Sequence, residues 1–411
     1  MDERLGIYIH IPFCASRCGY CDFCSYAGRD TLMHKYQHAL ESHILEATTQ
    51  LSTYLIDTVY FGGGTPSYFG ARRVCDVFNS LKRAGRVLKD AEVTVEVNPD
   101  STTKRDLALL RREGFNRLSI GVQSANPELL KLIGRRHNFK QAQKVVKSAR
   151  MVGFDNISID LIYGLPSQTR HDWADTLART IELRPEHVSL YGLKLEEGTP
   201  MYEYQNSPFL PDDDEQADMY LYAIDTMERN GYVQYEISNF SLNSYESKHN
   251  LKYWNLEDYM GFGPSAHSSI SGLRYSYVTD IDAYINGILN NEDILDEYED
   301  VNRLDRAAEY IMLGMRTTRG ISEKEYYKIY RSDFSKIDQL LAEFEKRGWS
   351  KRNGERWSFT STGFLLSNVL IGAILEAQAE QKLITTPWMR TATDSADYPA
   401  GNPDAAGKNM F

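Results

Sequence analysis

Short apolar runs alternate with longer amphipathic stretches through the first half of the chain, and this alternation constrains the fold most. The runs are rich in Val, Ile and Tyr, which is typical of buried strands, and they span 6–11, 57–62, 92–97, 117–123, 156–163 and 187–193. Helical patterns fill the intervals 32–54, 71–88, 103–113, 126–133, 139–152 and 169–183. Six β-α units predict an α/β fold, an incomplete TIM-like (β/α)6 barrel, with a doubly wound sheet as the alternative.

The pattern changes after residue 200, which suggests further domains. We expect a barrel core over 1–200, a barrel-associated extension over 201–300 and a mostly helical domain over 301–384. A helix over 213–230 would begin at the acidic "PDDDE", whose charge suits a helix N-terminus. Helices followed by a hairpin at 348–360 resemble a winged helix, and the segment from 385 to 411 is expected to be a disordered tail.

Composition excludes several classes of protein. The net charge of −11 argues against a nucleic-acid partner. No apolar run approaches the length of a membrane span, and the acidic N-terminus does not resemble a signal peptide. We therefore expect a cytoplasmic protein whose five cysteines are reduced rather than joined in disulfides.

Four of those cysteines lie in "PFCASRCGYCDFCSY", residues 12–26, with the spacing C-x3-C-x2-C-x2-C. Structural zinc sites usually pair two knuckles across a longer spacer, because four sulfurs must surround one ion. Iron–sulfur clusters accept closely spaced thiolates from one loop. The run directly follows the first expected strand, at the barrel mouth where active sites of such folds are built.

Within this run, Cys14, Cys18, Tyr20 and Cys21 form C-x3-C-x-Y-C, which resembles the signature of the radical S-adenosylmethionine (SAM) superfamily. The resemblance implies a [4Fe–4S] cluster held by Cys14, Cys18 and Cys21, with its fourth iron open for the methionine moiety of SAM. Cys24 is then a spare thiol, since a fourth cysteine ligand would close that iron. Cys75 lies on an apolar helix face and is expected to pack in the core.

Further polar residues follow the ends of expected strands. The glycines of "YFGGGTPSYF" permit positive φ and close approach, and would leave backbone N–H groups free for a carboxylate. By resemblance to the superfamily, this loop contacts the methionine end of SAM. Similar positions are occupied by Glu96, Gln123 and Asp160, while Arg135 follows a helix.

An ordered series of phrases resembles the oxygen-independent coproporphyrinogen III dehydrogenases (HemN) and, more closely, the haem chaperones (HemW). The series runs from about residue 5 to 376 and includes "YIHIPFC", "YFGGGTPS", "GVQS", "GRRH", "DLIYGLP", "LEEGTPMY", "YEISNF" and "HNLKYW". The resemblance implies a SAM site formed by Tyr8, Tyr20, Gly63, Gly64, Thr65, Glu96, Gln123, Arg135 and Asp160.

Two departures count against the dehydrogenases. Their fourth cysteine would fall at Phe23, and they carry an N-terminal extension, whereas this chain begins thirteen residues before Cys14. In contrast, His249, Asn250 and Tyr253 match the H-N-x-x-Y motif associated with haem binding in the chaperones. On a helix, His249 and Tyr253 would share one face, and imidazole and phenolate are both known ligands of haem iron.

The resemblance therefore implies a protein that binds haem and delivers it to an apo-haemoprotein, in which the cluster and SAM have a regulatory, assembly or redox role. Implied partners are a respiratory acceptor, an electron donor such as flavodoxin or ferredoxin, and at most a transient membrane contact. SAM cleavage is expected. Coproporphyrinogen dehydrogenation remains the alternative, followed by a radical SAM methyltransferase or cyclopropanase, and more distantly a zinc protein without enzymatic activity.

Overall fold

The computed structural model describes residues 3–380, so the expected disordered tail from 385 to 411 lies outside the described residues. The described residues divide into two compact units, 3–302 with Arg316–Arg319 and Arg303–Met315 with 320–380. No helix among the described residues is long and apolar enough to span a bilayer.

The first unit contains the predicted (β/α)6 arrangement. Six strands pair in parallel in the order β1 (Arg4–Ile11), β4 (Leu55–Gly63), β5 (Arg86–Val97), β6 (Arg117–Gln123), β7 (Ile157–Tyr163) and β8 (His187–Gly192). Ile7, Ile9 and Ile11 are fully buried on one face of β1, and His10 is buried on the other face. Burial on both faces explains why these strands read as nearly continuous apolar runs.

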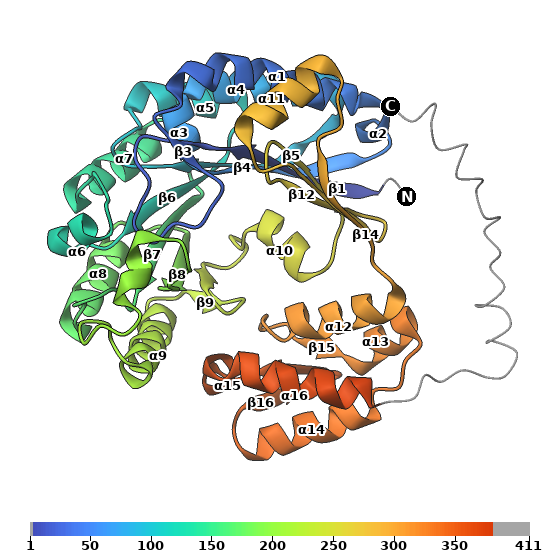
Figure 1. Cartoon of the computed structure of the whole chain (residues 1–411). Coiled ribbons are helices and arrows are strands. Elements are labelled where there is room, and N and C mark those ends of the chain that lie inside the picture. The colour runs from blue at the N-terminus through green and yellow to red at the C-terminus, as the bar shows by residue number, and fades with distance from the viewer. Residues whose placement is uncertain (1–2, 381–411) are drawn as a thin grey trace, which may run out of the picture. The chain divides into compact units, whose positions relative to one another are not determined.

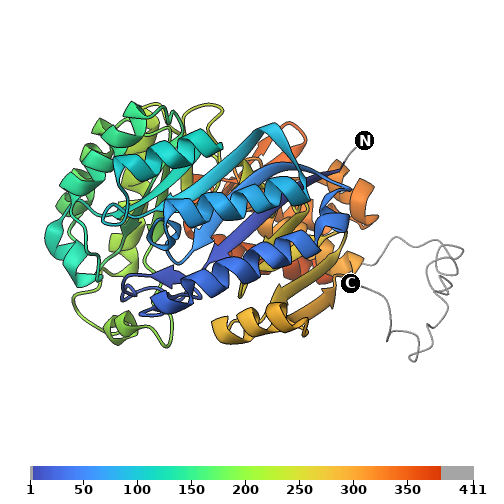
Figure 2. The same cartoon turned by 90° about the horizontal axis from the view of Figure 1, so that it is seen from above.

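Helices connect these strands and cover the outer face of the curved sheet (Figure 1). They are α1 (Met33–Glu46), α2 (Thr48–Leu51), α3 (Pro66–Phe69), α4 (Ala71–Ala84), α5 (Lys104–Glu113), α6 (Pro127–Leu132), α7 (Phe139–Met151) and α8 (Arg170–Glu182). In Figure 2, α1 and α4 are the blue helices that pack side by side. Capping boxes begin α5, α7 and α8, so local sequence fixes where these helices start.

Two predicted helices differ from the structure. The single helix expected over 32–54 is broken at Ala47 into α1 and α2. The helix expected over 71–88 ends at Ala84, because Gly85 is extended and β5 begins at Arg86.

The region after β8 extends the sheet at both edges, which the sequence analysis did not predict. Its elements are η2 (Pro200–Tyr204), α9 (Asp213–Arg229), β9 (Val233–Gln234), β10 (Asn239–Ser241), α10 (Lys248–Trp254), β11 (Tyr259–Phe262), β12 (His267–Ile270), β13 (Leu273–Tyr277), α11 (Ile281–Asn290) and β14 (Leu295–Asp300). The resulting order is β14-β13-β12-β11-β1-β4-β5-β6-β7-β8-β10-β9. Within the described part of the chain the two edges do not pair, so the barrel is open.

The second unit is mostly helical and contains the predicted hairpin. Its elements are α12 (Arg303–Gly314), β15 (Ile321–Ser322), α13 (Glu323–Tyr330), α14 (Ser335–Lys346), β16 (Ser350–Asn353), β17 (Arg356–Phe359), α15 (Ser361–Leu365) and α16 (Ser367–Ala379). The strands pair in the order β15-β17-β16, and Ile311, Tyr326, Leu341 and Trp357 are buried in the core of this unit.

Candidate functional site

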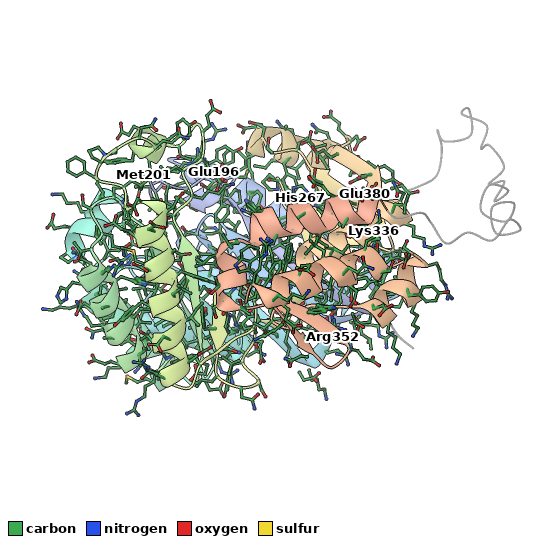
Figure 3. All side chains as sticks on the ribbon, turned by 90° about the horizontal axis from the view of Figure 1, so that it is seen from below. Glu196, Met201, His267, Lys336, Arg352 and Glu380 are labelled. Carbon is green, nitrogen blue, oxygen red and sulfur yellow. The ribbon has the colours of Figure 1, made fainter. Side chains whose placement is uncertain are left out.

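The cysteine loop is held by backbone hydrogen bonds at its ends and at its middle. β2 (Phe13–Cys14) pairs with β3 (Tyr26–Ala27), and the Tyr26 N–H donates to the Pro12 carbonyl at 2.7 Å. Between them, Gly19 donates to the Ile133 carbonyl at 3.2 Å and accepts from the Met201 N–H at 2.9 Å. Met201 and the nearby Glu196 are labelled in Figure 3. The loop is therefore positioned by the chain around it.

The four thiols of this loop face two different cavities. Cys14, Cys18 and Cys21 line the larger cavity, of about 410 Å³. Cys24 lines the smaller one, of about 400 Å³, and its Sγ donates to the Thr279 carbonyl at 3.4 Å. The structure thus separates the three cysteines of the C-x3-C-x2-C motif from the fourth.

Polar side chains lie beside two of these three thiols. Cys14 Sγ lies 3.4 Å from Thr65 Oγ1, and Arg135 Nη1 donates to Cys18 Sγ at 3.6 Å. Burial raises the pKa of the Cys14 and Cys21 thiols. No group of three or more His, Cys, Asp or Glu side chains in residues 3–380 is arranged around one metal ion. A [4Fe–4S] cluster does not need such convergence, because each cysteine binds a different iron.

The glycine loop packs directly against the start of the cysteine loop. Gly63 has a φ of +107°, and a Cβ there would lie 2.5 Å from the His10 ring. A Cβ on Gly64 would lie 2.9 Å from the Ile11 and Phe13 backbones. The Gly64 and Thr65 N–H groups donate to the Ile11 and Phe13 carbonyls, each at 2.8 Å. The expectation that this loop leaves its N–H groups free for a ligand is therefore wrong for these two groups.

Two partly buried carboxyl groups, those of Glu96 and Asp160, face the larger cavity. Burial raises the pKa of Glu96 to about 8, and the proximity of Asp160 adds to the shift, while hydrogen bonds from Tyr60 (2.9 Å) and the Gly63 N–H oppose it. Burial also raises the pKa of Asp160, although it accepts hydrogen bonds from the hydroxyls of Ser119 and Ser189. Glu96 is thus largely neutral at pH 7 in the ligand-free protein and would ionise if a cation bound beside it.

Arg135 connects the polar wall of the cavity to the cysteine loop. Its Nη2 donates to Asn98 Oδ1 at 2.7 Å and to the Gly121 carbonyl at 2.6 Å. Gln123, at the end of β6, has a φ of +65°. A strained backbone of this kind is often found at ligand sites. The arrangement fixes a guanidinium beside Cys18.

The H-N-x-x-Y motif forms most of α10, on the inner side of the sheet (Figure 1). His249 is buried, and its two ring nitrogens are hydrogen-bonded to Thr58 Oγ1 (2.9 Å) and the Tyr253 hydroxyl (2.8 Å). Burial, with Lys252 and Arg117 nearby, lowers the pKa of His249 to about 3. The predicted shared face of His249 and Tyr253 is confirmed, but no ring nitrogen of His249 is available to a ligand in this arrangement.

The structure brings most of the sequence-predicted residues into one cavity. The larger cavity is lined by Cys14, Cys18, Tyr20, Cys21, Gly63, Gly64, Thr65, Glu96, Gln123, Arg135, Asp160 and Asn250. Tyr8 and Tyr253 instead line the smaller cavity, together with Gly63 and Glu96, and His249 lines neither.

Asn98 and Arg117 also line the larger cavity but were not predicted from the sequence. Asn98 stands within the quoted "VEVNPD", so its position after a strand was a usable signal. Arg117 opens β6 and is only 2% exposed. An arginine at the start of a strand gives no sequence signal that it will be buried, because burial depends on the closure of the sheet around it.

The Radical SAM superfamily profile matches residues 8–180, and the HemN C-terminal domain profile matches residues 301–366. "Heme chaperone HemW" of Bacillus subtilis is 35% identical over 372 residues, covering 90% of this chain and 98% of that protein. The chain belongs to the HemW family. The HemW proteins of Lactococcus lactis and Escherichia coli are 33% and 30% identical, covering 88% and 90% of this chain and 94% and 98% of theirs.

The fold of this HemW family member also matches a solved structure. Coproporphyrinogen III oxidase (HemN) from Escherichia coli, described as a radical SAM enzyme, superimposes with a TM-score of 0.80 at 25% identity, covering 91% of this chain and 90% of that one. The resemblance to HemN and HemW seen in the sequence is thereby confirmed, as is a radical SAM fold with a C-terminal helical domain.

Proposed function

We propose that this chain holds a [4Fe–4S] cluster and SAM in the larger cavity, binds haem, and delivers the haem to apo-haemoproteins. The observation that carries the proposal is the separation of the thiols: Cys14, Cys18 and Cys21 share a cavity, whereas Cys24 faces another. Three ligands leave one iron open, as SAM binding to a cluster requires. Membership of the HemW family favours haem as the cargo.

The SAM-binding role falls to the residues around the three thiols. Tyr20, Gly63, Gly64, Thr65, Glu96, Gln123, Arg135 and Asp160 line the same cavity as these thiols, and Tyr8 lies in the adjoining one. The neutral Glu96 would become a carboxylate beside the amino end of SAM. A reduced cluster would supply the electron that cleaves the carbon–sulfur bond of SAM.

The haem-binding role of the H-N-x-x-Y motif is assigned to α10 as a whole. Asn250 lines the larger cavity and Tyr253 the smaller one, so α10 contributes to both walls. His249 holds the Tyr253 hydroxyl at 2.8 Å and thereby fixes the orientation of that ring. We assign His249 a positioning role and Tyr253 a contact with the macrocycle.

We propose a cytoplasmic protein with a respiratory apo-haemoprotein as acceptor, a flavodoxin or ferredoxin as electron donor and at most transient contact with a membrane. The net charge of −11 supports the absence of a nucleic-acid partner.

Coproporphyrinogen III dehydrogenation is the second candidate, since the HemN structure has the same fold. Phe23 stands where the resemblance places the fourth cysteine of that enzyme, and its side chain is 64% exposed. A phenyl ring cannot supply a thiol, so we give the dehydrogenase activity second place.

Transfer of haem tests the proposal. The reconstituted protein, loaded with one haem per chain, is mixed anaerobically with the apo form of a b-type cytochrome, and the cytochrome spectrum is followed with and without SAM. We expect the rate of haem transfer to the apo-cytochrome to exceed the rate at which the protein loses haem spontaneously to a scavenging apoprotein. A transfer rate equal to that spontaneous loss, or failure to bind haem, would contradict the proposal. To show whether transfer depends on the cluster, Cys14→Ala is compared with Cys75→Ala, a variant at a buried cysteine on α4 that lines neither cavity.

A further inference from the structure

Most of the nine histidines are unavailable to a ligand in the cavities. His10, His43, His137, His187 and His249 are buried and hydrogen-bonded. His10 uses both ring nitrogens, one with the Tyr8 hydroxyl (3.0 Å) and one with the Cys24 carbonyl (2.8 Å). His34, His38 and His171 are exposed on α1 and α8 and line neither cavity.

His267 differs from these eight residues. It opens β12, its side chain is exposed, and it makes no side-chain hydrogen bond or ion pair within residues 3–380. It lines the smaller cavity. Figure 3 labels this residue. His267 is therefore the histidine that presents a free imidazole to a cavity beside the cysteine loop.

The turn before His267 is strained and tightly held. Gly263 and Ser265 have φ values of +109° and +60°. The Ser265 N–H donates to the Val278 carbonyl at 3.1 Å, and the Ala266 carbonyl accepts from the Tyr277 N–H at 3.2 Å. A non-glycine residue in the left-handed region next to a cavity is typical of a ligand clamp. The turn fixes the backbone from which His267 extends.

The walls of the smaller cavity suit a flat aromatic macrocycle. Beside His267 they contain the rings of Tyr8, Phe23, Tyr253 and Tyr259. Phe23 is 64% exposed, so its ring is accessible to a ligand in this cavity. The volume of about 400 Å³ lies within the range of cofactor sites, about 300–1,000 Å³.

We propose that His267 is the axial ligand of the haem iron and that the haem lies in the smaller cavity against Phe23, Tyr253 and Tyr259. The inference rests on the proposed function, since it takes haem as the cargo. We assign the iron ligand to His267 and not to His249, because both ring nitrogens of His249 are already hydrogen-bonded, whereas those of His267 are free. The thiols proposed to hold the cluster line the other cavity, which adjoins this one because Asp22, Phe23, Gly63 and Glu96 line both.

The other candidate ligands of the smaller cavity are less suited to iron. Cys24 and Tyr253 would bind as thiolate and phenolate. Burial raises the pKa of both groups, which disfavours those anions, and the Cys24 thiol is engaged with the Thr279 carbonyl. A neutral imidazole needs no deprotonation to bind iron.

The test compares haem complexes of the reconstituted full-length protein and its His267→Ala, His249→Ala and Cys24→Ala variants. Difference spectra against the same protein without haem remove the absorption of the cluster, and electron paramagnetic resonance of ferric haem reports the axial ligand. We expect His267→Ala to change the resonance and to lose haem at least about tenfold faster. Added imidazole should restore the wild-type spectrum. His249→Ala should lower the melting temperature but leave the haem spectrum of its folded fraction unchanged.

The outcomes separate this proposal from the proposed function. Wild-type protein that binds haem, with an unchanged spectrum in His267→Ala, would overturn the assignment of His267 and leave haem binding intact. A changed axial ligand in Cys24→Ala, or in folded His249→Ala, would overturn it in favour of that residue. Wild-type protein that binds no haem would overturn both proposals.

Discussion

Single residues decide what the two cavities can bind. Cys14 and Cys24 belong to one short loop, yet the thiol of Cys14 lies beside Thr65 and that of Cys24 beside the Thr279 carbonyl. The loop turns between β2 and β3, so neighbouring cysteines point in different directions. The sequence spacing alone allowed either three or four ligands, because spacing does not fix the direction of a side chain.

Replacing single cysteines tests this separation. Cys14→Ala, Cys18→Ala or Cys21→Ala should abolish the cluster after anaerobic reconstitution, since each removes a required ligand. Cys24→Ala should retain about four irons per chain and still cleave SAM. Iron and sulfide analysis with detection of 5′-deoxyadenosine measures both properties. Loss of the cluster in Cys24→Ala would show that four cysteines hold it.

Glu96 should make SAM binding depend on pH. Its pKa of about 8 means that the ligand-free carboxyl is protonated at pH 7, so forming the carboxylate beside SAM must release that proton. Affinity should therefore rise with pH up to about 8 and level off above it. Calorimetry in two buffers of different ionisation enthalpy counts the protons released.

Glu96→Gln is the matched control, because the amide keeps the shape but cannot ionise. Any protons that SAM itself releases on binding are the same for both proteins. The difference in proton release between the two proteins is therefore due to Glu96. We expect the wild type to release about one proton more than Glu96→Gln near pH 7. Equal release from the two proteins would mean that Glu96 stays neutral in the complex.

At the scale of elements, the position of α10 controls the inner face of the sheet. The buried Glu92 of β5 accepts hydrogen bonds from the Lys248 and His249 N–H groups, both at 3.1 Å. Lys252 of the same helix pairs with Asp57 of β4 at 2.9 Å. A helix of seven residues has little stability alone, so these contacts hold it in place.

Glu92→Gln should destabilise the protein through α10. The amide can accept only one of the two hydrogen bonds, so we expect the free energy of unfolding to fall by about 1 kcal/mol. Urea unfolding followed by circular dichroism measures this. Glu228→Gln, at an exposed position near the end of α9, should change it by less than about 0.5 kcal/mol. Similar losses in the two variants would mean that Glu92 does not stabilise α10.

Elements buried on both faces were the ones that the sequence predicted well. The six parallel strands have continuous apolar runs, and capping boxes mark several of the helices between them. The strands β13 and β14 went unpredicted, because β14 is exposed along its whole length and β13 mixes buried with exposed residues. The strands β11 and β12 are mostly buried, but each has only four residues, which is too short for a clear periodic pattern. Their apolar pattern is correspondingly weak.

The candidate site was predictable only where a motif existed. Resemblance supplied the cysteines, the glycine loop and the strand-end residues that now share one cavity. It could not reveal that the ring nitrogens of His249 are already bonded, or that His267 is free, because both facts depend on contacts between distant segments such as Thr58 and α10.

At the scale of the whole molecule, the fold is compatible with two activities, haem delivery and coproporphyrinogen III dehydrogenation. The chain is 35% identical to a HemW protein over nearly its full length, yet its fold superimposes on HemN with a TM-score of 0.80. Because fold alone does not decide function, the choice depends on what happens to a porphyrin in the presence of the cluster and SAM.

The most direct measurement gives the protein haem and coproporphyrinogen III together, so that the two compounds compete for it. The reconstituted, reduced protein is incubated anaerobically with SAM and an equimolar mixture of haem and coproporphyrinogen III, and then separated by gel filtration. The account predicts about one haem eluting with each chain, and coproporphyrinogen III recovered unchanged without released carbon dioxide. Protoporphyrinogen IX and carbon dioxide, with haem remaining in the free fraction, would contradict it.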